Sequence, residues 1–163
     1  MDHLPLQTTT VLLILFTGLS AGLCFTWSNA ITPGIGKLDD LGYLSAFQQM
    51  NRSIVNPLFI MVFFAPFFLG LLKIYLVKNE ATMFWFVIIS VALYFFGVLL
   101  VTLFGNIPLN DLLDKTDLAK TRIEDLKLLR RQFETKWNRL HLIRTISSIS
   151  SFMILILILF IKK

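Results

Sequence analysis

The segment WNRLHLIRT, residues 137–145, carries side chains that could do chemistry at helical spacing. At 100° per residue, Trp137, His141 and Arg144 fall within one narrow sector of a helix, and Thr145 lies at the edge of that sector. Imidazole can exchange a proton near neutral pH, and guanidinium can bind an anion. The stripe runs on through serine residues into a strongly apolar segment, so it predicts a polar site close to hydrocarbon.

Arg144 is the most informative residue of this stripe, because a charge near hydrocarbon is costly and usually faces a bundle interior or a wet cavity. The alternative is that its side chain snorkels to the membrane surface, as we expect for Arg139 on the opposite face. Because His141 and Ser148, on either side of Arg144 in the stripe, are also polar, we expect Arg144 to face the interior. A lone histidine is more often a structural residue than a base, so both roles stay open for His141.

Other apolar segments bring amide and indole side chains to the same membrane face as the stripe. These candidate site residues are Trp27, Asn51, Asn56, Asn106 and Asn110. Part of the convergence has a structural explanation, since Asn caps helix ends and Trp is common at membrane interfaces. The chain has one cysteine and two histidines, Cys24, His3 and His141, so we expect neither an intramolecular disulfide nor a metal site.

Composition identifies the elements that must position these residues. Of the 163 residues, 56% are hydrophobic and only 15% are charged, which is typical of a membrane protein. Four apolar segments, 10–30, 54–76, 82–104 and 142–161, each have the roughly 20 residues that cross a bilayer. We therefore predict an all-α fold, an integral membrane four-helix bundle that forms one domain over residues 1–163. The first segment is expected to be a retained anchor, because no Lys or Arg precedes it and it is longer than a signal-peptide core.

Two long connections are expected to lie on one side of the membrane. In the first, Pro33, Gly34 and Gly36 are expected to end the first span, and an amphipathic helix follows over 41–52. Asn56 can then cap the second span, with Pro57 in its first turn; Pro66 lies inside that span and is expected to kink it.

In the second connection, Gly105 is expected to end the third span and Asn110 to cap a new helix. An amphipathic helix over about 112–141 should continue unbroken into the fourth span, so that one helix runs from Thr116 to Ile161. The two spans leave the membrane through related sequences, SNAITPG and GNIPLN, each with an Asn a few residues before a Pro.

The distribution of Lys and Arg predicts the orientation of the bundle. Most of these residues fall in the two long connections, and few lie near the termini or the turn at 77–81. The positive-inside rule then makes the connections cytoplasmic and places both termini outside a plasma membrane. Because the basic residues alternate with Asp and Glu, we expect a solvated helix and no nucleic-acid partner. The expected partner is the lipid bilayer, and a homo-oligomer is left open.

Four motifs in order, GLCFTWSNAITPGIGKLDD, AFQQMNRSIVNPLF, GNIPLNDLLDK and FETKWNRLHLIRTISS, resemble the anthrone oxygenase-like family, catalogued as domain of unknown function 1772. The resemblance covers nearly the whole chain, with four spans. The family pattern falls on Pro33, Asn51, Asn56, Pro57, Asn106, Pro108, Asn110, Trp137, Arg144 and Thr145.

The resemblance implies a reaction, because fungal members are implicated in oxidising anthrones to anthraquinones without an evident cofactor. His141 would then be the base, Arg144 the oxyanion partner and Trp137 the aromatic platform. An apolar aromatic substrate would be held by Trp27, Asn51, Asn56, Asn106, Asn110 and Thr145, with no cofactor. The alternative is a non-catalytic module that binds a ligand or lipid, or a subunit of a membrane assembly. A catalytic site predicts a cavity at Arg144, whereas an architectural role predicts paired polar groups without a void.

Overall fold

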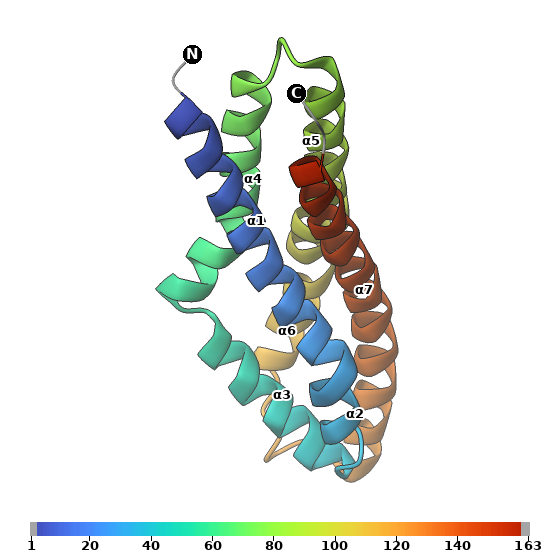
Figure 1. Ribbon diagram of the computed structural model, residues 1–163. Coiled ribbons are helices and arrows are strands. Elements are labelled where there is room, and N and C mark those ends of the chain that lie inside the picture. The colour runs from blue at the N-terminus through green and yellow to red at the C-terminus, as the bar shows by residue number, and fades with distance from the viewer. Residues whose placement is uncertain (1–2, 161–163) are drawn as a thin grey trace.

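The computed structural model describes residues 3–160, and side chains from residue 5 onward. All regular structure in this part of the chain is helical, which confirms the all-α prediction. Four helical rods are long and apolar enough to cross a membrane: Pro5–Ile35, Pro57–Leu76, Ala81–Asp114 and Ile123–Phe160. Figure 1 shows them side by side, with the start of the first and the end of the last at the same end of the bundle.

Each rod is built from consecutive helical segments. The first contains α1 (His3–Thr26), the π-helical turn η1 (Trp27–Ile31) and α2 (Thr32–Ile35), and the second is α4 (Pro57–Leu76). The third contains α5 (Ala81–Tyr94), the π-helical turns η2 (Phe95–Leu100) and η3 (Thr102–Asn106), and α6 (Ile107–Asp114). The fourth contains α7 (Ile123–Leu157) and a 3-10 turn, η4 (Ile158–Phe160). A shorter helix, α3 (Asp40–Ile54), connects the first two rods.

At the end that carries the termini, the rods pack closely through small residues and hydroxyl pairs. A Cβ atom on Gly97 would collide with the side chain of Ser147, so η2 lies directly against α7. Ser90 and Ser151 hydrogen bond to each other across α5 and α7. Lipid is as apolar as a leucine side chain, so such close packing and interhelical hydrogen bonds, rather than hydrophobic burial, hold spans together.

Tyr94 joins three rods near the middle of the bundle. Its hydroxyl lies 2.8 Å from Ser20 Oγ on α1 and donates to the Phe63 carbonyl on α4. That carbonyl precedes Pro66, which lies inside α4 and has no N–H to donate. A buried hydroxyl thus supplies a hydrogen bond where proline weakens the helical ladder.

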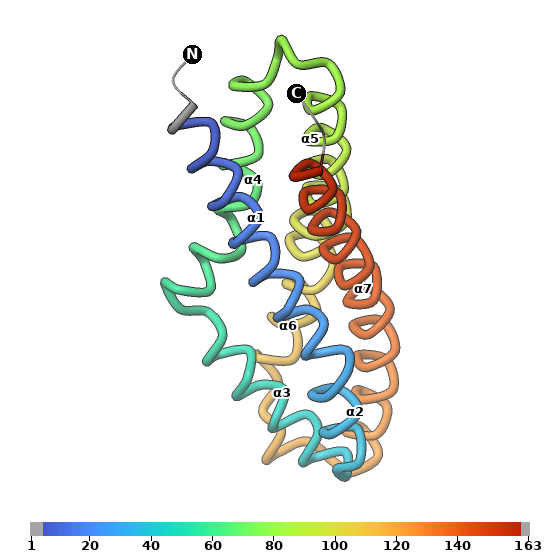
Figure 2. Tube along the Cα trace, in the orientation of Figure 1, coloured from blue at the N-terminus to red at the C-terminus, as the bar shows by residue number. Residues whose placement is uncertain are grey.

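At the opposite end, α3 lies across the rods and forms a second layer (Figure 2). Its apolar face buries Tyr43, Leu44 and Phe47 against Phe133 and Trp137 of α7. This confirms the amphipathic helix expected over 41–52 and extends it at both ends. Asp39 caps α3 by accepting a hydrogen bond from the Gly42 N–H.

Arg130 of α7 fastens this second layer to the bundle. Its guanidinium donates to Glu134, to Asp40 and to the carbonyls of Gly36 and Leu38. It also lies 4.5 Å from the ring centroid of Tyr43. Burial raises the pKa of the Tyr43 phenol, so the ring beside Arg130 stays neutral. Several carbonyls and a carboxylate are thus bound by one planar donor group, which suits Arg better than Lys.

The predicted ends of the first and third spans are wrong, because both rods continue through their Pro- and Gly-containing sequences. Each passes through a π turn just before its proline, with the Thr32 N–H bonded to the Trp27 carbonyl and the Ile107 N–H to the Thr102 carbonyl. The proline then falls in the first turn of the next α-helical segment, where a missing N–H is tolerated. No described glycine has a positive φ, so Gly105 does not form a left-handed helix cap.

The single amphipathic helix predicted over 112–141 is also wrong. The structure has α6 to Asp114, turns and bends over 115–122, and α7 from Ile123. The hydroxyl of Thr121 donates to the Asp117 carbonyl, which is the kind of side-chain bond that competes with a helix. From Ile123 the helix runs without interruption to Leu157, so the expected continuity through residues 137–144 is confirmed. Residues 161–163 lie outside the described part.

Candidate functional site

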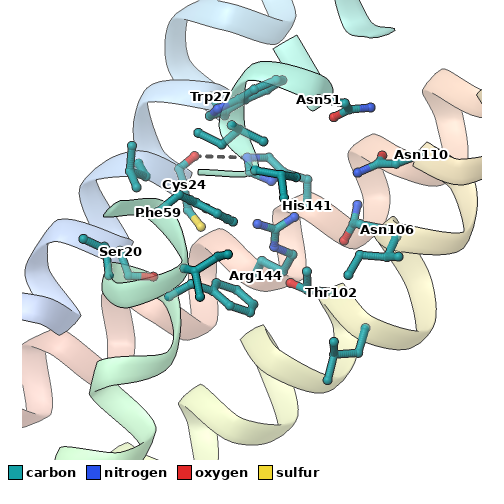
Figure 3. A pocket seen from close by; sticks show the side chains of 18 of the residues that line it. Ser20, Cys24, Trp27, Asn51, Phe59, Thr102, Asn106, Asn110, His141 and Arg144 are labelled. Atoms are coloured by element: carbon teal, nitrogen blue, oxygen red, sulfur yellow. Dashed lines mark hydrogen bonds between the residues drawn. The ribbon is translucent and has the colours of Figure 1, made fainter. Parts of the chain in front are cut away.

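A cavity of about 210 Å³ lies where the second layer meets the rods. Because a water molecule occupies about 30 Å³, it has room for about seven waters or one compact ligand. Its lining is largely aliphatic and aromatic, with a few polar groups, which is the usual character of a small-molecule site. The polar lining residues are Ser20, Cys24, Asn51, Thr102, Asn106, Asn110, His141 and Arg144, as Figure 3 shows.

Three successive turns of α7 contribute the stripe that the sequence singled out. Trp137, His141 and Arg144 all line the cavity. The Trp137 and His141 rings stack, with centroids 4.7 Å apart and planes 19° from parallel. Trp137 Nε1 donates to Asn110 Oδ1 at 2.9 Å, so the indole is held from its polar edge. The stripe therefore has a fixed upper end, against which His141 is oriented.

The hydrogen bond of His141 defines its free nitrogen. Its Nε2 lies 3.1 Å from the Cys24 carbonyl oxygen on α1, and a carbonyl can only accept a hydrogen bond. Nε2 therefore carries the hydrogen, and in the neutral ring Nδ1 keeps its lone pair. Nδ1 is buried and has no hydrogen-bond partner. This arrangement, one ring nitrogen anchored and the other open, is what a general base requires.

Unpaired polar atoms are concentrated around the cavity. Among the described side chains, six buried nitrogen or oxygen atoms have no hydrogen-bond partner. Four of them belong to cavity-lining residues: Asn51 Nδ2, Asn106 Oδ1, His141 Nδ1 and Arg144 Nε. Burying an unpaired polar group costs about 1–3 kcal/mol. A ligand or water that bonds these atoms would recover that free energy, so the cluster marks a place that receives a polar ligand group.

The charge of the site is positive. Arg144 lies between Cys24, Asn106 and His141 in Figure 3, and no Asp or Glu is among the residues that line the cavity. Glu134, the closest acid before it on α7, is paired with Arg130 one turn further away. Asn106 is anchored only weakly, by a 3.4 Å bond from Nδ2 to the Trp137 carbonyl. The cavity therefore favours a ligand with an anionic or strongly polarised oxygen.

Most of the predicted site residues meet at this cavity. Trp27, Asn51, Asn106 and Asn110 line it together with the α7 stripe. Asn56 and Thr145 do not line it, so the structure gives neither a direct ligand contact.

Asn56 caps α4 by accepting from the Phe59 N–H. The Thr145 hydroxyl donates within hydrogen-bond distance of the His141 and Cys24 carbonyls and lies 2.8 Å from Ser28 Oγ. It thereby supports the carbonyl that orients His141.

The sequence analysis missed several lining residues. Ser20 and Cys24 precede Trp27 on one face of α1, at spacings of seven and three, so the indole could have pointed to them. The apolar wall from α4 includes Phe59, Val62, Phe63 and Phe64. It had no distinguishing signal, because the chain contains 16 phenylalanines. Within residues 5–160, no group of three or more His, Cys, Asp or Glu side chains is arranged to hold a metal ion.

Comparison with known proteins gives one match. A family model described as anthrone oxygenase matches residues 47–154, which is most of the chain and includes α3, α4, the third rod and nearly all of α7. No curated protein and no solved structure matches the sequence.

Proposed function

Because the chain belongs to the anthrone oxygenase family, we propose that it uses dioxygen to oxidise an apolar, anthrone-type aromatic molecule in the cavity beside Arg144. One observation carries the proposal: an apolar, aromatic-lined space contains an open imidazole nitrogen, unpaired amide atoms and a guanidinium without an acidic neighbour. These are the groups needed to remove a proton from a ring system and hold the resulting anion.

The first step is deprotonation of the substrate. An anthrone has a methylene carbon opposite its carbonyl, and loss of a methylene proton makes the ring system aromatic throughout. His141 Nδ1 takes that proton, while the Nε2–H bond to the Cys24 carbonyl keeps the ring oriented. The negative charge then spreads to the former carbonyl oxygen. Arg144 Nε and Asn51 Nδ2, both unpaired, are the donors available to that oxygen.

The electron-rich anion can react with dioxygen itself. It passes one electron to dioxygen, and the two radicals combine to form a carbon–oxygen bond at the former methylene carbon. The peroxide oxygen accepts the proton held by His141. Loss of the second methylene proton then breaks the O–O bond and releases hydroxide, which combines with that proton as water. One anthrone and one dioxygen thus give one anthraquinone and one water, so the stoichiometry requires no external reductant.

The test is turnover of anthrone by the full-length protein in liposomes, measured as anthraquinone formed and oxygen consumed. Arg144→Met should lower kcat/KM about 100-fold or more, which is the usual effect of removing an oxyanion donor. Arg144→Lys should recover only part of it, because a lysine lacks the planar fork. The matched control is Arg139→Met, since Arg139 is an exposed charge on the same helix, outside the cavity.

Equal turnover by the parent and Arg144→Met would remove the residue on which the mechanism depends. If anthrone binds to the parent protein and is released unchanged, with no oxygen consumed, the chain is a membrane ligand-binding module. The largely apolar lining suits that alternative as well.

A further inference from the structure

The cavity has an opening whose rim is aliphatic. Four of its lining residues are also well exposed at the molecular surface: Val55 at 68%, Ile60 at 46%, Leu103 at 40% and Ile107 at 39%. A side chain that touches both a cavity and the exterior marks a mouth. Val55 and Ile60 lie at the start of α4, and Leu103 and Ile107 lie in η3 and α6, so the mouth opens between the second and third rods.

The opposite wall of the cavity is closed toward the polar end of the molecule. There, Trp27 and Trp137 pack on Phe47 of α3, with ring centroids 5.6 Å and 4.8 Å from the phenylalanine. Phe47 and Trp137 are buried, and Arg130 fastens the start of α3 to α7. These three aromatic residues are called the roof below. A ligand coming from water would have to displace the roof.

The surroundings of the mouth indicate which solvent it faces. Both rods that frame it have the length and hydropathy of membrane spans. The four rim side chains carry no polar atom, whereas a mouth open to water would expose unpaired carbon surface to it. In Figures 1 and 2 the chain turns from α3 into α4 at the outer edge of the molecule, beside this gap. Leu23 is also exposed and lines the cavity, but it borders a separate groove along α1 that includes Gly18 and Phe152.

We propose that this opening is a lateral portal through which apolar aromatic molecules reach the cavity from the lipid bilayer, and that Ile60 and Leu103 set its width. The portal serves the pocket of the proposed function, but it can be tested without turnover. Cys24, the only cysteine, is buried and lines the cavity, so the rate at which its thiol is modified reports arrival of a reagent inside.

The experiment uses the full-length protein in liposomes and two maleimides, N-phenylmaleimide and its 4-sulfonate. The thiol adds across the maleimide double bond, forming one carbon–sulfur bond while the thiol proton moves to the neighbouring carbon. Each rate is divided by the rate of the same reagent with a free thiol in solution. The uncharged reagent should modify Cys24 at least about tenfold faster than the sulfonate. The double variant Ile60→Phe/Leu103→Phe should slow the uncharged reagent about tenfold, and Ile60→Ala/Leu103→Ala should accelerate it.

Leu58→Phe and Met61→Phe are the matched controls, because both residues are exposed on the same part of α4 and neither lines the cavity. Both should label at the parent rate. The portal is refuted if the sulfonate labels as fast as the uncharged reagent. It is also refuted if neither portal variant changes the rate while Phe47→Ala, which opens the roof, raises it. Failure of anthrone turnover with these labelling rates intact would refute the proposed reaction and leave the portal standing.

Discussion

The chemistry of the site depends on which nitrogen of one imidazole is occupied. His141 is oriented by a carbonyl on another rod and by the stacked Trp137, so its open Nδ1 is a consequence of packing between α1 and α7. The sequence places His141, Trp137 and Arg144 on one face, but it does not contain the hydrogen bond to Cys24. At this scale, the roles of the three residues separate into a proton acceptor, an aromatic support and a cation.

His141→Gln tests the proton acceptor. The glutamine amide can still donate to the Cys24 carbonyl, so the fold and anthrone binding should change little, but no basic nitrogen remains. We expect kcat to fall by about 100-fold or more, in the range usual for a general base. Anthrone affinity measured by equilibrium binding should stay within about threefold, an affinity change of under 1 kcal/mol. An unchanged kcat would show that proton removal does not depend on His141.

At the scale of the elements, the sequence predicted the four spans and the short amphipathic helix because hydrophobic length and periodicity determine them. It mispredicted where the first and third spans end. Gly105 and Pro108 are breakers in an isolated segment, yet tertiary packing keeps that segment helical: Gly105 lies against Leu140, and Asn106 bonds to the Trp137 carbonyl. The largely phenylalanine wall of the cavity was equally hidden, since lipid-facing and cavity-facing phenylalanines look alike in a sequence.

Gly97→Ala tests the close packing between η2 and α7. The added methyl would collide with Ser147, so the two elements must shift, and overpacking of this kind costs about 1–3 kcal/mol. The variant should therefore unfold at a lower temperature in detergent, as measured by loss of helical circular dichroism. Gly22→Ala is the matched control, because nothing lies within 4 Å of the position that its methyl would occupy. A Gly97→Ala protein as heat-stable as the control would contradict the close contact.

At the scale of the whole molecule, the two ends of the bundle differ in construction. The end near the termini is closed by hydroxyl pairs and apolar contacts, and the other end carries the second layer, the cavity and most of the charged residues. All four rods and α3 contribute lining residues, so the cavity exists only in the assembled bundle. The positive-inside rule predicts that this charged end faces the cytoplasm.

Orientation can be measured with single cysteines at Lys78 and Lys120 in a Cys24→Ser background. Lys78 lies in the turn between α4 and α5, and Lys120 lies in the turn region before α7, at the opposite end. A membrane-impermeant maleimide added to intact cells should label position 78 and leave position 120 unlabelled until the cells are lysed. Labelling of position 120 in intact cells would reverse the predicted topology.

The two π turns have a consequence for how this sequence tolerates insertions and deletions. A π turn holds about one residue more than the α turn that it replaces, and one residue corresponds to about 100° of rotation. Deleting a single residue from η3 would let the rod revert to a regular α-helix and turn everything beyond it about its axis. Asn110 would then leave Trp137, and the cavity would lose that wall although its composition had hardly changed. The reading frame of these rods around their own axes, and not only their residue types, is thus part of what a descendant sequence must preserve.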